Sequence, residues 1–428
     1  MGYFDESKFL DEYIIKDRTV LKPEYQPEKL EERDEELDEY IKLLRPVLKG
    51  WDLDNLFVYG ASGVGKTVAT RTLLPDLREN AAKQGIDVDI IETNCSSANT
   101  SYQSAIEVIN EARNPQYPLT TLSVGGEEMS KTGHPAEKVY DTLFKELEKG
   151  SEHIILVLDE INTLGSDSEL LYQLTRAQTM QKLDAEVCII GISNDFDFKD
   201  NLPARVKDTL CESELHFPPY ERKDLLSIIN RRVDRAFYDG ACPNAAIELC
   251  VGLSVRDRGS ARQAIRLLRK AAEIAENEAM DGKDVEEITE EHVREAERII
   301  EKKHVSTGIQ KLTHHRKYTL LAIANLAAEG NTPCQTAKIY EYYKLVAEEH
   351  GRDPLTRRGA HEHLLEMVDN GILRNVNRSS KGRGRPNKYK LDTPFETVVN
   401  ALENSDDGEI KNLDELRNKA KKNNLNSL

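Results

Sequence analysis

Residues 60–67 of the chain are Gly60-Ala61-Ser62-Gly63-Val64-Gly65-Lys66-Thr67. They fit the phosphate-binding pattern G-x-x-x-x-G-K-[ST], in which glycines let successive backbone N–H groups point at phosphate oxygens. The apolar residues 55–59 before the loop are typical of a strand, and residues 68–74 after it are typical of a helix with an anion-attracting N-terminus. Lys66 is expected to reach the β and γ phosphates and Thr67 to bind Mg2+. This context favours a nucleotide site over a simple glycine-rich turn.

A run of apolar residues, 153–158, ends in the acid pair Asp159-Glu160. Such a run is typical of a strand buried on both faces of a parallel sheet, and such sheets bind ligands at the carboxyl ends of their strands. Asp159 is expected to bind Mg2+ together with Thr67, and Glu160 to orient or deprotonate the attacking water. Two acids can also simply terminate a core strand, but the phosphate loop upstream favours the catalytic interpretation.

A third apolar run, residues 185–192, is followed by Ser193-Asn194-Asp195. The amide of Asn194 at this strand tip could contact the γ-phosphate or the attacking water. Asparagine is also a common turn residue, since its side chain bonds to its own backbone. The residues alone leave both interpretations open.

The composition fits a protein of the cell interior. A chain of 428 residues is long enough for about two to four domains. No apolar stretch approaches the roughly 18 residues of a membrane span, and the acidic N-terminus does not resemble a signal peptide. The six cysteines are scattered without a C-x-x-C pair, so neither a zinc site nor a disulfide framework is indicated. We expect a cytoplasmic protein with no membrane contact.

Charge is unevenly distributed along the chain. The formal net charge is -17, made up of -21 over residues 1–310, +5 over residues 311–400 and -1 over residues 401–428. An acidic body repels nucleic acid, so any binding must be local. Residues 372–390 contain no acid and hold the cations Arg374, Arg378, Lys381, Arg383, Arg385, Lys388 and Lys390.

These patterns predict an α/β fold with added domains. We expect an N-terminal tail (1–30), a phosphate-loop core with a parallel sheet (31–215), a helical lid (216–305), a winged-helix domain (310–395) and a C-terminal tail (396–428). In the lid, Gly259-Ser260 can start a helix and would place Arg262 in its first turn. There Arg262 could reach the γ-phosphate, although the residues alone favour an ordinary surface arginine.

The basic region has the pattern of a winged helix. Helices are expected over 318–328, 336–350 and 356–370, followed by a hairpin with strands at 372–376 and 388–391. The last helix would enter the major groove of DNA, with Thr356, Arg357 and Arg358 at its N-terminal end. The loop residues Lys381, Arg383 and Arg385 would follow phosphates or the minor groove. A protein-binding winged helix with a solvated basic loop is the alternative.

These parts, in this order, resemble the archaeal origin-recognition initiator family of AAA+ ATPases, which is related to the eukaryotic origin-recognition and cell-division-cycle initiators. The resemblance covers about residues 20–395. Beyond the general ATPase motifs it is carried by Tyr25-Gln26-Pro27-Glu28 with Arg33, Thr93-Asn94-Cys95, Gly191-Ile192-Ser193-Asn194-Asp195, Arg205-Val206-Lys207, Phe217-Pro218-Pro219-Tyr220, Leu373-Arg374 and Gly382-Arg383-Gly384-Arg385.

The resemblance implies roles for single residues. Asn194 looks like the family's first sensor, and Arg262 like its second sensor, which reverses the preference for a surface arginine. Tyr220 resembles the tyrosine beside the adenine, and Arg232 a nucleotide contact of the lid. Arg205 is similar to the arginine that such ATPases offer to a neighbour's γ-phosphate.

The resemblance extends to a DNA-contacting insertion and has two departures. Residues 118–139 resemble the helical insertion that initiators use to touch DNA, but hold only two lysines against three glutamates. Asp208-Thr209 replaces the usual serine pair, and Glu32-Arg33-Asp34 stands where a His-Arg pair is common. Neither departure removes a nucleotide ligand.

The function implied is that of an ATP-dependent replication initiator. It would use ATP/ADP and Mg2+, bind double-stranded origin DNA in the nucleoid, and hydrolyse ATP slowly as a switch of the lid. The replicative helicase and paralogous initiators are the other partners implied. Two alternatives are an ATP-sensing transcriptional regulator and an assembly ATPase whose winged helix binds protein.

Overall fold

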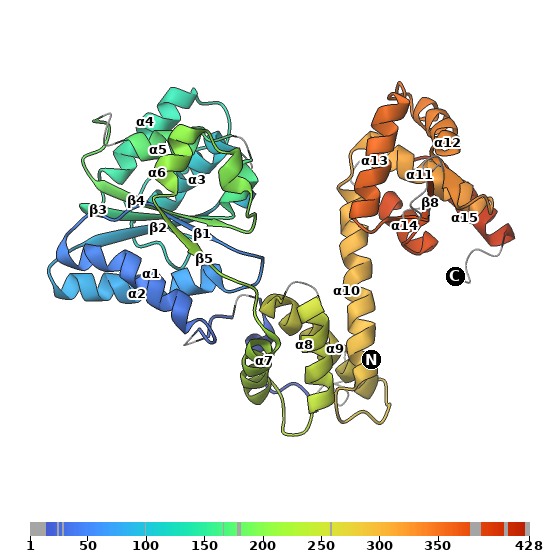
Figure 1. The fold of residues 1–428 in the computed structure, drawn as a ribbon, viewed down its shortest axis with the longest axis horizontal. Coiled ribbons are helices and arrows are strands. Elements are labelled where there is room, and N and C mark those ends of the chain that lie inside the picture. Colours follow the sequence, from blue (N-terminus) through green and yellow to red (C-terminus); the bar gives the residue numbers. More distant parts are fainter. Residues whose placement is uncertain are drawn as a thin grey trace, which may run out of the picture. The chain divides into compact units, whose positions relative to one another are not determined.

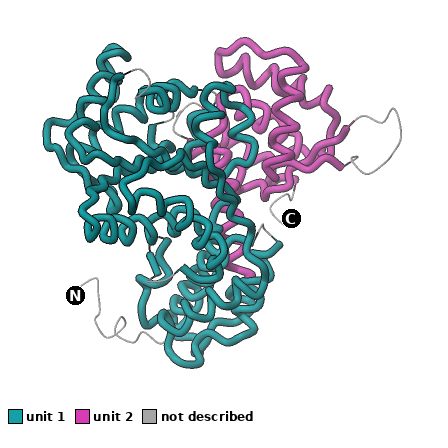
Figure 2. The backbone as a smooth tube through the Cα atoms, turned by 60° about the vertical axis from the view of Figure 1, so that its left-hand side comes forward, with its two compact units in different colours: residues 1–293 teal, residues 294–428 magenta. Residues whose placement is uncertain are grey.

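The computed structural model describes residues 14–423 except 24, 28–29, 99, 166, 178–180, 257–258, 377–386 and 406–409 (Figure 1). The chain divides into two compact units, Met1–Val293 and Arg294–Leu428 (Figure 2). Within the described ranges, none of the helices combines the length and the apolar character needed to span a membrane.

The core of the first unit is a five-stranded parallel sheet, as the sequence predicts. Its strands lie in the order β2-β3-β4-β1-β5. Their bounds are β1 Leu56–Tyr59, β2 Val88–Asn94, β3 His153–Asp159, β4 Glu186–Ser193 and β5 Ser213–His216. In this register Tyr59 lies opposite Ser193, and Asn94 opposite Asp159. The carboxyl ends of β1, β3 and β4 therefore meet at one edge, where the phosphate loop, the acid pair and Asn194 follow.

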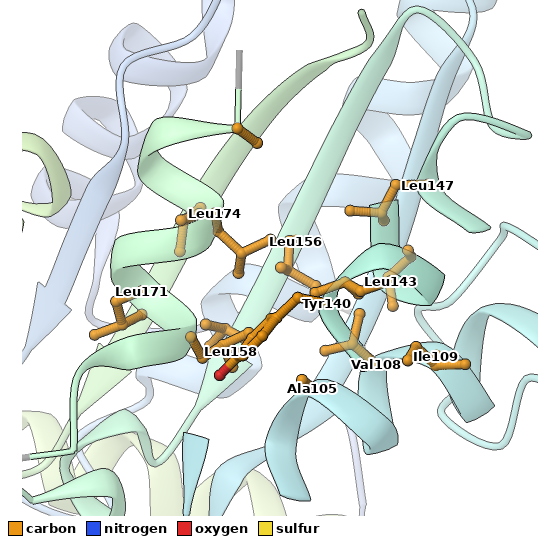
Figure 3. Packing of buried hydrophobic residues seen from close by; sticks show 14 of the residues in the cluster. Ala105, Val108, Ile109, Tyr140, Leu143, Leu147, Leu156, Leu158, Leu171 and Leu174 are labelled. Atoms are coloured by element: carbon orange, nitrogen blue, oxygen red, sulfur yellow. The ribbon is translucent and has the colours of Figure 1, made fainter. Parts of the chain in front are cut away.

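Helices cover both faces of this sheet. Figure 1 shows α1 and α2 on one face and α3, α4, α5 and α6 on the other. Their bounds are α1 Asp34–Leu44, α2 Lys66–Lys83, α3 Ser101–Arg113, α4 Ala136–Leu147, α5 Glu169–Arg176 and α6 Ala204–Leu210. Along β3, Ile155 and Val157 pack toward α2, whereas Leu156 and Leu158 pack among the residues of α3, α4 and α5 (Figure 3). Because β3 is buried on both faces, its end is a firm support for catalytic groups.

The segment before α4 differs from the expected helical insertion. No helix forms between Asn114 and Pro135, all of which the structure describes. Gly125 and Gly126 have positive φ values of +69° and +136°, which interrupt a helix. The segment instead lies against α3, where Asn110 Nδ2 donates to the Met129 carbonyl at 2.9 Å.

The lid contains α7 Arg222–Ala236, α8 Asn244–Arg256 and α9 Ala261–Met280, and α10 Glu290–Gln310 runs on into the second unit. The described part of the expected N-terminal tail is not free. Residues 14–22, including the short 3-10 helix Arg18–Leu21, pack on the lid: the N–H groups of Lys16 and Asp17 both donate to the Ala236 carbonyl, at 2.7 and 3.0 Å. The apolar residues Ile14, Ile15, Val20 and Leu21 are buried there.

The second unit contains the predicted winged helix. Three helices, α11 His314–Ala328, α12 Thr336–Glu349 and α13 Arg357–Asp369, pack with an antiparallel sheet in the order β6-β8-β7. Its strands are β6 Cys334–Gln335, β7 Leu373–Asn375 and β8 Lys388–Leu391. The short β6 has no sequence pattern of its own and was not expected.

The prediction that residues 396–428 form a C-terminal tail is wrong for most of this range. Residues 395–403 form α14 (Phe395–Glu403) and residues 413–422 form α15 (Leu413–Lys422). Val398, Leu402 and Leu416 are buried in the same hydrophobic cluster as α11. Arg417 of α15 pairs with Glu403 at 2.5 Å. Both helices therefore complete the core of the winged-helix domain.

We expect Leu416→Ala to destabilise this domain. Leu416 is 2% exposed, and removal of such a buried side chain leaves a cavity that costs about 2–5 kcal/mol. Calorimetry of the full chain should show a lower melting temperature for the transition of the winged-helix domain. The control Lys419→Ala changes a partly exposed residue of the same helix, whose i,i+4 pair with Glu415 contributes little, so it should have little effect. Equal melting of the two variants would contradict the role given to α15.

Candidate nucleotide-binding site and DNA-binding helix

The phosphate loop lies between β1 and α2, as the motif predicts. Its bends need glycine: Gly60 has a φ of +151° and Gly63 a φ of +81°. A Cβ atom on Gly60 would lie 2.2 Å from the Phe217 carbonyl oxygen, and one on Gly63 2.1 Å from Ser260 Oγ. Larger residues are therefore excluded at both positions by backbone angle and by neighbouring atoms.

Neighbouring groups hold the carbonyl oxygens of the loop. Lys66 Nζ donates to the carbonyls of Gly60 and Ala61 at 2.7 and 2.9 Å. The Ala261 N–H donates to the Gly63 carbonyl at 3.2 Å, and Arg33 Nε to the Val64 carbonyl at 3.0 Å. In this structure the loop is supported by contacts to its carbonyl groups, whereas phosphate binding uses its N–H groups.

Lys66 is the buried cation of the site. It is 7% exposed, and burial lowers its pKa to about 8; Asp159 opposes this shift and Arg262 adds to it. In this structure the Lys66 ammonium donates to the carbonyl oxygens of Gly60 and Ala61. In a nucleotide complex, phosphate oxygens would accept these hydrogen bonds. The ammonium can exchange these partners for phosphate without leaving the loop.

Thr67 and Asp159 meet at the mouth of the site. Thr67 Oγ1 donates to Asp159 Oδ2 at 3.0 Å. Burial raises the pKa of Asp159, and the hydrogen bonds from Thr67 and from the Glu160 N–H act in the opposite direction. A hydroxyl beside a carboxylate is a set of hard oxygen donors of the kind that Mg2+ prefers. These two residues therefore fit the predicted metal ligands.

Glu160 has an unusual backbone. Its φ is +53° and its ψ +40°, a left-handed conformation that costs a non-glycine residue about 1–3 kcal/mol. Two bonds stabilise it: the Glu160 N–H donates to Asp159 Oδ1 at 2.9 Å, and Thr163 Oγ1 donates to the Glu160 carbonyl at 2.8 Å. Strain of this kind clusters at functional sites, which supports the catalytic role predicted for Glu160.

Asn194 lies at the exposed end of β4, next to β3 in the sheet. Its position depends on Asn162, whose Oδ1 accepts from the Asn194 N–H at 3.3 Å and from Ser193 Oγ at 3.5 Å. Asn162 is not among the residues predicted from the sequence. Its only signal is its place two residues after the acid pair, which no general motif marks.

Arg262 lies beside the phosphate loop. Ser260 caps α9, accepting from the Gln263 N–H, and the first turn of the helix then carries Arg262. A Cβ atom on Gly63 would lie 2.9 Å from Arg262 Cβ. This placement favours the sensor interpretation of Arg262 over that of an unrelated surface arginine.

Tyr220 is covered on one face by Arg33, for which the sequence predicts no role in the site. The Arg33 guanidinium lies 3.8 Å from the centre of the Tyr220 ring. Tyr220 is 4% exposed, and its hydroxyl lies 3.0 Å from the place of a Cβ on Gly65. Tyr220 is therefore close to the phosphate loop, and its place beside the adenine stays a prediction.

The DNA-binding residues predicted on α13 lie at its start. Thr356 caps the helix by accepting from the Gly359 N–H at 3.3 Å, and Arg357 and Arg358 are exposed. The preceding turn is held on both sides: Tyr343 accepts from the Leu355 N–H at 2.9 Å, and Tyr340 donates to the Leu355 carbonyl at 3.0 Å. The predicted wing residues Lys381, Arg383 and Arg385 lie outside the described residues.

Comparisons with known proteins cover both units. Family models match in order an AAA ATPase domain over residues 29–190, a Cdc6 AAA+ ATPase-type lid domain over 226–298 and a CDC6 C-terminal winged helix domain over 307–401. An ORC1-type DNA replication protein of Haloarcula marismortui is 43% identical over 391 residues, which are 91% of this chain and 92% of that protein. A second, from Halobacterium salinarum, is 41% identical over 393 residues, 91% and 92% of the two chains.

The chain belongs to the ORC1/Cdc6 family of AAA+ DNA replication proteins. Among solved structures, the Aeropyrum pernix ORC1 protein in complex with DNA is 35% identical, with a TM-score of 0.75 and coverage of 92% of this chain and 98% of that one. The family resemblance and the fold class predicted from the sequence are confirmed.

Two further arginines with roles implied by the ORC1/Cdc6 family have defined neighbours. Arg232 donates to the Val20 carbonyl at 2.9 Å and stacks 4.1 Å from the Tyr25 ring. It therefore lies against the N-terminal segment of the chain that packs on the lid, and its nucleotide contact stays a prediction. Arg205 is exposed on α6, with its guanidinium 4.1 Å from the centre of the Tyr172 ring. Its role toward a second chain also stays a prediction.

We expect nucleotide affinity to fall as the pH rises above about 8. The nucleotide-free protein releases the Lys66 proton near pH 8, whereas bound phosphate stabilises the ammonium. The complex therefore holds more protons than the free protein, and affinity should fall by up to about tenfold per pH unit above that pKa. Fluorescent ADP titrations between about pH 7 and pH 10 measure this dependence.

Lys66→Arg is the control, because its guanidinium stays charged over this range. Its affinity, although lower, should vary little with pH. The same decline in both proteins would show that another group causes it.

Proposed function

We propose that the chain is an ATP-dependent initiator of DNA replication that binds double-stranded origin DNA through its winged-helix domain. The observation that carries this proposal is the 43% identity to an ORC1-type DNA replication protein over both units of the chain. The residues for nucleotide binding lie in the first unit, and those for DNA binding lie at the exposed start of α13 in the second.

Hydrolysis would proceed by direct attack of water on the γ-phosphate. Glu160 takes a proton from the water as its oxygen bonds to phosphorus, and the bond to the β–γ bridging oxygen breaks, leaving ADP and phosphate. Lys66 stabilises charge on the phosphate oxygens, and Asn194 orients the water. Thr67 and Asp159 would hold Mg2+, which would offset negative charge on the phosphates.

We propose that hydrolysis is slow and acts as a switch. Only ATP carries the γ-phosphate that Arg262 and Asn194 can contact, so ATP and ADP would favour different positions of the lid. An arginine such as Arg205 would reach this phosphate only from a second chain, which would keep turnover low in a single chain. Paralogous initiators are candidates for that chain, and the replicative helicase for a later partner.

DNA binding would be local and dependent on salt. The chain carries a net charge of -17, so contact must concentrate on the basic winged-helix domain. Arg357 and Arg358 extend from a helix start that Thr356, Tyr340 and Tyr343 hold in place. Rigid support of this kind favours reading of base edges or nearby phosphates by α13. The basic loop with Lys381, Arg383 and Arg385 would add contacts to the DNA backbone or minor groove.

Glu160→Gln should bind ATP normally and lose hydrolysis. The amide keeps the size of the side chain but cannot accept the proton of the water, so only the chemical step is affected. ATP affinity and single-turnover hydrolysis should be measured together. Lys66→Ala is the contrasting variant, because it should lose binding itself. Normal turnover in Glu160→Gln would refute the role of this acid.

Replacement of Arg357 and Arg358 by alanine should weaken binding to specific DNA. Loss of a bidentate base contact costs about 1–3 kcal/mol of binding free energy. Loss of a phosphate contact reduces the slope of log K against log salt concentration by about 0.9. Mapping of the protein on its own genome should place the native chain at replication origins and show reduced occupancy for the double variant.

The control is Lys223→Ala, an exposed cation of the lid helix α7. It should leave the map unchanged. Occupancy restricted to promoters would favour a transcriptional regulator and contradict the proposed function.

A further inference from the structure

Arg33 lies immediately before α1 and is almost fully buried, with 3% exposure. Its side chain has three hydrogen-bonding partners. Nε donates to the Val64 carbonyl at 3.0 Å, Nη2 to the Pro218 carbonyl at 2.5 Å, and Nη1 to Glu36 at 2.7 Å. One guanidinium thus bridges the phosphate loop and the segment at the base of the lid.

The guanidinium is also packed between rings. It lies 3.8 Å from the centre of the Tyr220 ring and 5.7 Å from that of Phe217. A planar guanidinium can stack and donate in several fixed directions at once, which an ammonium cannot do. Glu36 balances its charge, so burial leaves no uncompensated cation.

The segments that Arg33 joins form a closed path of contacts. From Pro218 the chain reaches Tyr220, whose N–H donates to the Gly259 carbonyl at 3.2 Å. Two residues on, the Ala261 N–H donates to the Gly63 carbonyl at 3.2 Å, which returns the path to the phosphate loop. The path is tight, because a Cβ on Gly259 would lie 2.5 Å from the Tyr220 carbonyl oxygen.

We propose that Arg33 is a positioning residue that couples occupancy of the phosphate loop to the lid. Peptide groups are planar, so an N–H that turns toward phosphate carries the carbonyl of the same peptide group with it. A turn of the Val64–Gly65 peptide group therefore moves the Val64 carbonyl and the guanidinium bonded to it. The guanidinium passes this displacement to Pro218 and, through Tyr220, to the start of α9.

This inference rests on the nucleotide binding in the proposed function and does not depend on its DNA-binding part. A simpler role for Arg33 is purely structural: a staple in this sense is a residue that stabilises the fold and transmits no response to nucleotide. The two roles differ in what nucleotide does to the lid. A coupling residue transmits a response from the loop to residues 218–225 and 259–268, whereas a staple affects stability and leaves that response intact.

Hydrogen–deuterium exchange with and without ADP separates these roles. In the native chain, ADP should change protection in the phosphate loop and also in residues 218–225 and 259–268. In Arg33→Met, ADP should still protect the loop, with affinity reduced by about tenfold, while the response of the two lid segments is lost. Arg33→Lys keeps the charge but lacks the planar fork, so it should show the same loss with a smaller fall in melting temperature.

Arg231→Met is the matched control. Arg231 also joins the lid to the segment before α1, through Glu31 at 2.6 Å, but it is 61% exposed and Glu31 is not part of the loop. This variant should keep the full response of both lid segments.

The outcomes distinguish the inference from the function on which it rests. A native response of the lid in folded Arg33→Met or Arg33→Lys would overturn the coupling role. If Arg33→Met does not fold, Arg33→Lys alone decides. Failure of the native chain to bind ADP would instead overturn the nucleotide site itself, and the coupling with it.

Discussion

The nucleotide site depends on holding the Lys66 ammonium almost out of water. Burial alone would favour the neutral amine, and Asp159 and Glu160 oppose that tendency while Arg33 and Arg262 add to it. Arg33 is itself paired with Glu36, so Lys66 and Arg262 are the cations that remain for the phosphates of a nucleotide. The loop glycines, the strained Glu160 and the bond from Ala261 of α9 to Gly63 all lie around this ammonium.

The fold could be predicted where a segment is buried on both faces or has a firm helical period. β1, β3 and β4 are apolar runs, and the winged-helix elements alternate clearly with turn residues. β2 (Val88–Asn94) was missed because its Asp89 and Glu92 break the apolar run. α14 and α15 were missed because a short apolar stripe between charged residues was interpreted as a tail, and its burial depends on contacts with α11 that are distant in sequence.

The site could be predicted as far as its motifs extend. The positions of the loop, the acid pair and Asn194 follow from the meeting of strand ends at one edge of a parallel sheet, whereas the role of Arg262 is implied only by the family resemblance. Asn162 belongs to no motif, and Arg33, although it is one of the residues that carry the family resemblance, acts through a neighbour and so could not be given a role. Their positions become clear only when the hydrogen bonds of Asn194 and of the Val64 carbonyl are traced.

The energy available from these contacts is sufficient for a switch. Allosteric coupling between two sites commonly amounts to about 1–3 kcal/mol, or roughly 5–150-fold in affinity. A hydrogen bond to a charged group contributes about 1.5–3 kcal/mol, so a single contact between Arg262 and a γ-phosphate supplies that amount. The contact is useful only if the lid can respond as a unit. Arg33 would give it that property, because it joins the loop to Pro218, and the backbone bonds of Tyr220 and Ala261 connect that segment and the loop to the start of α9.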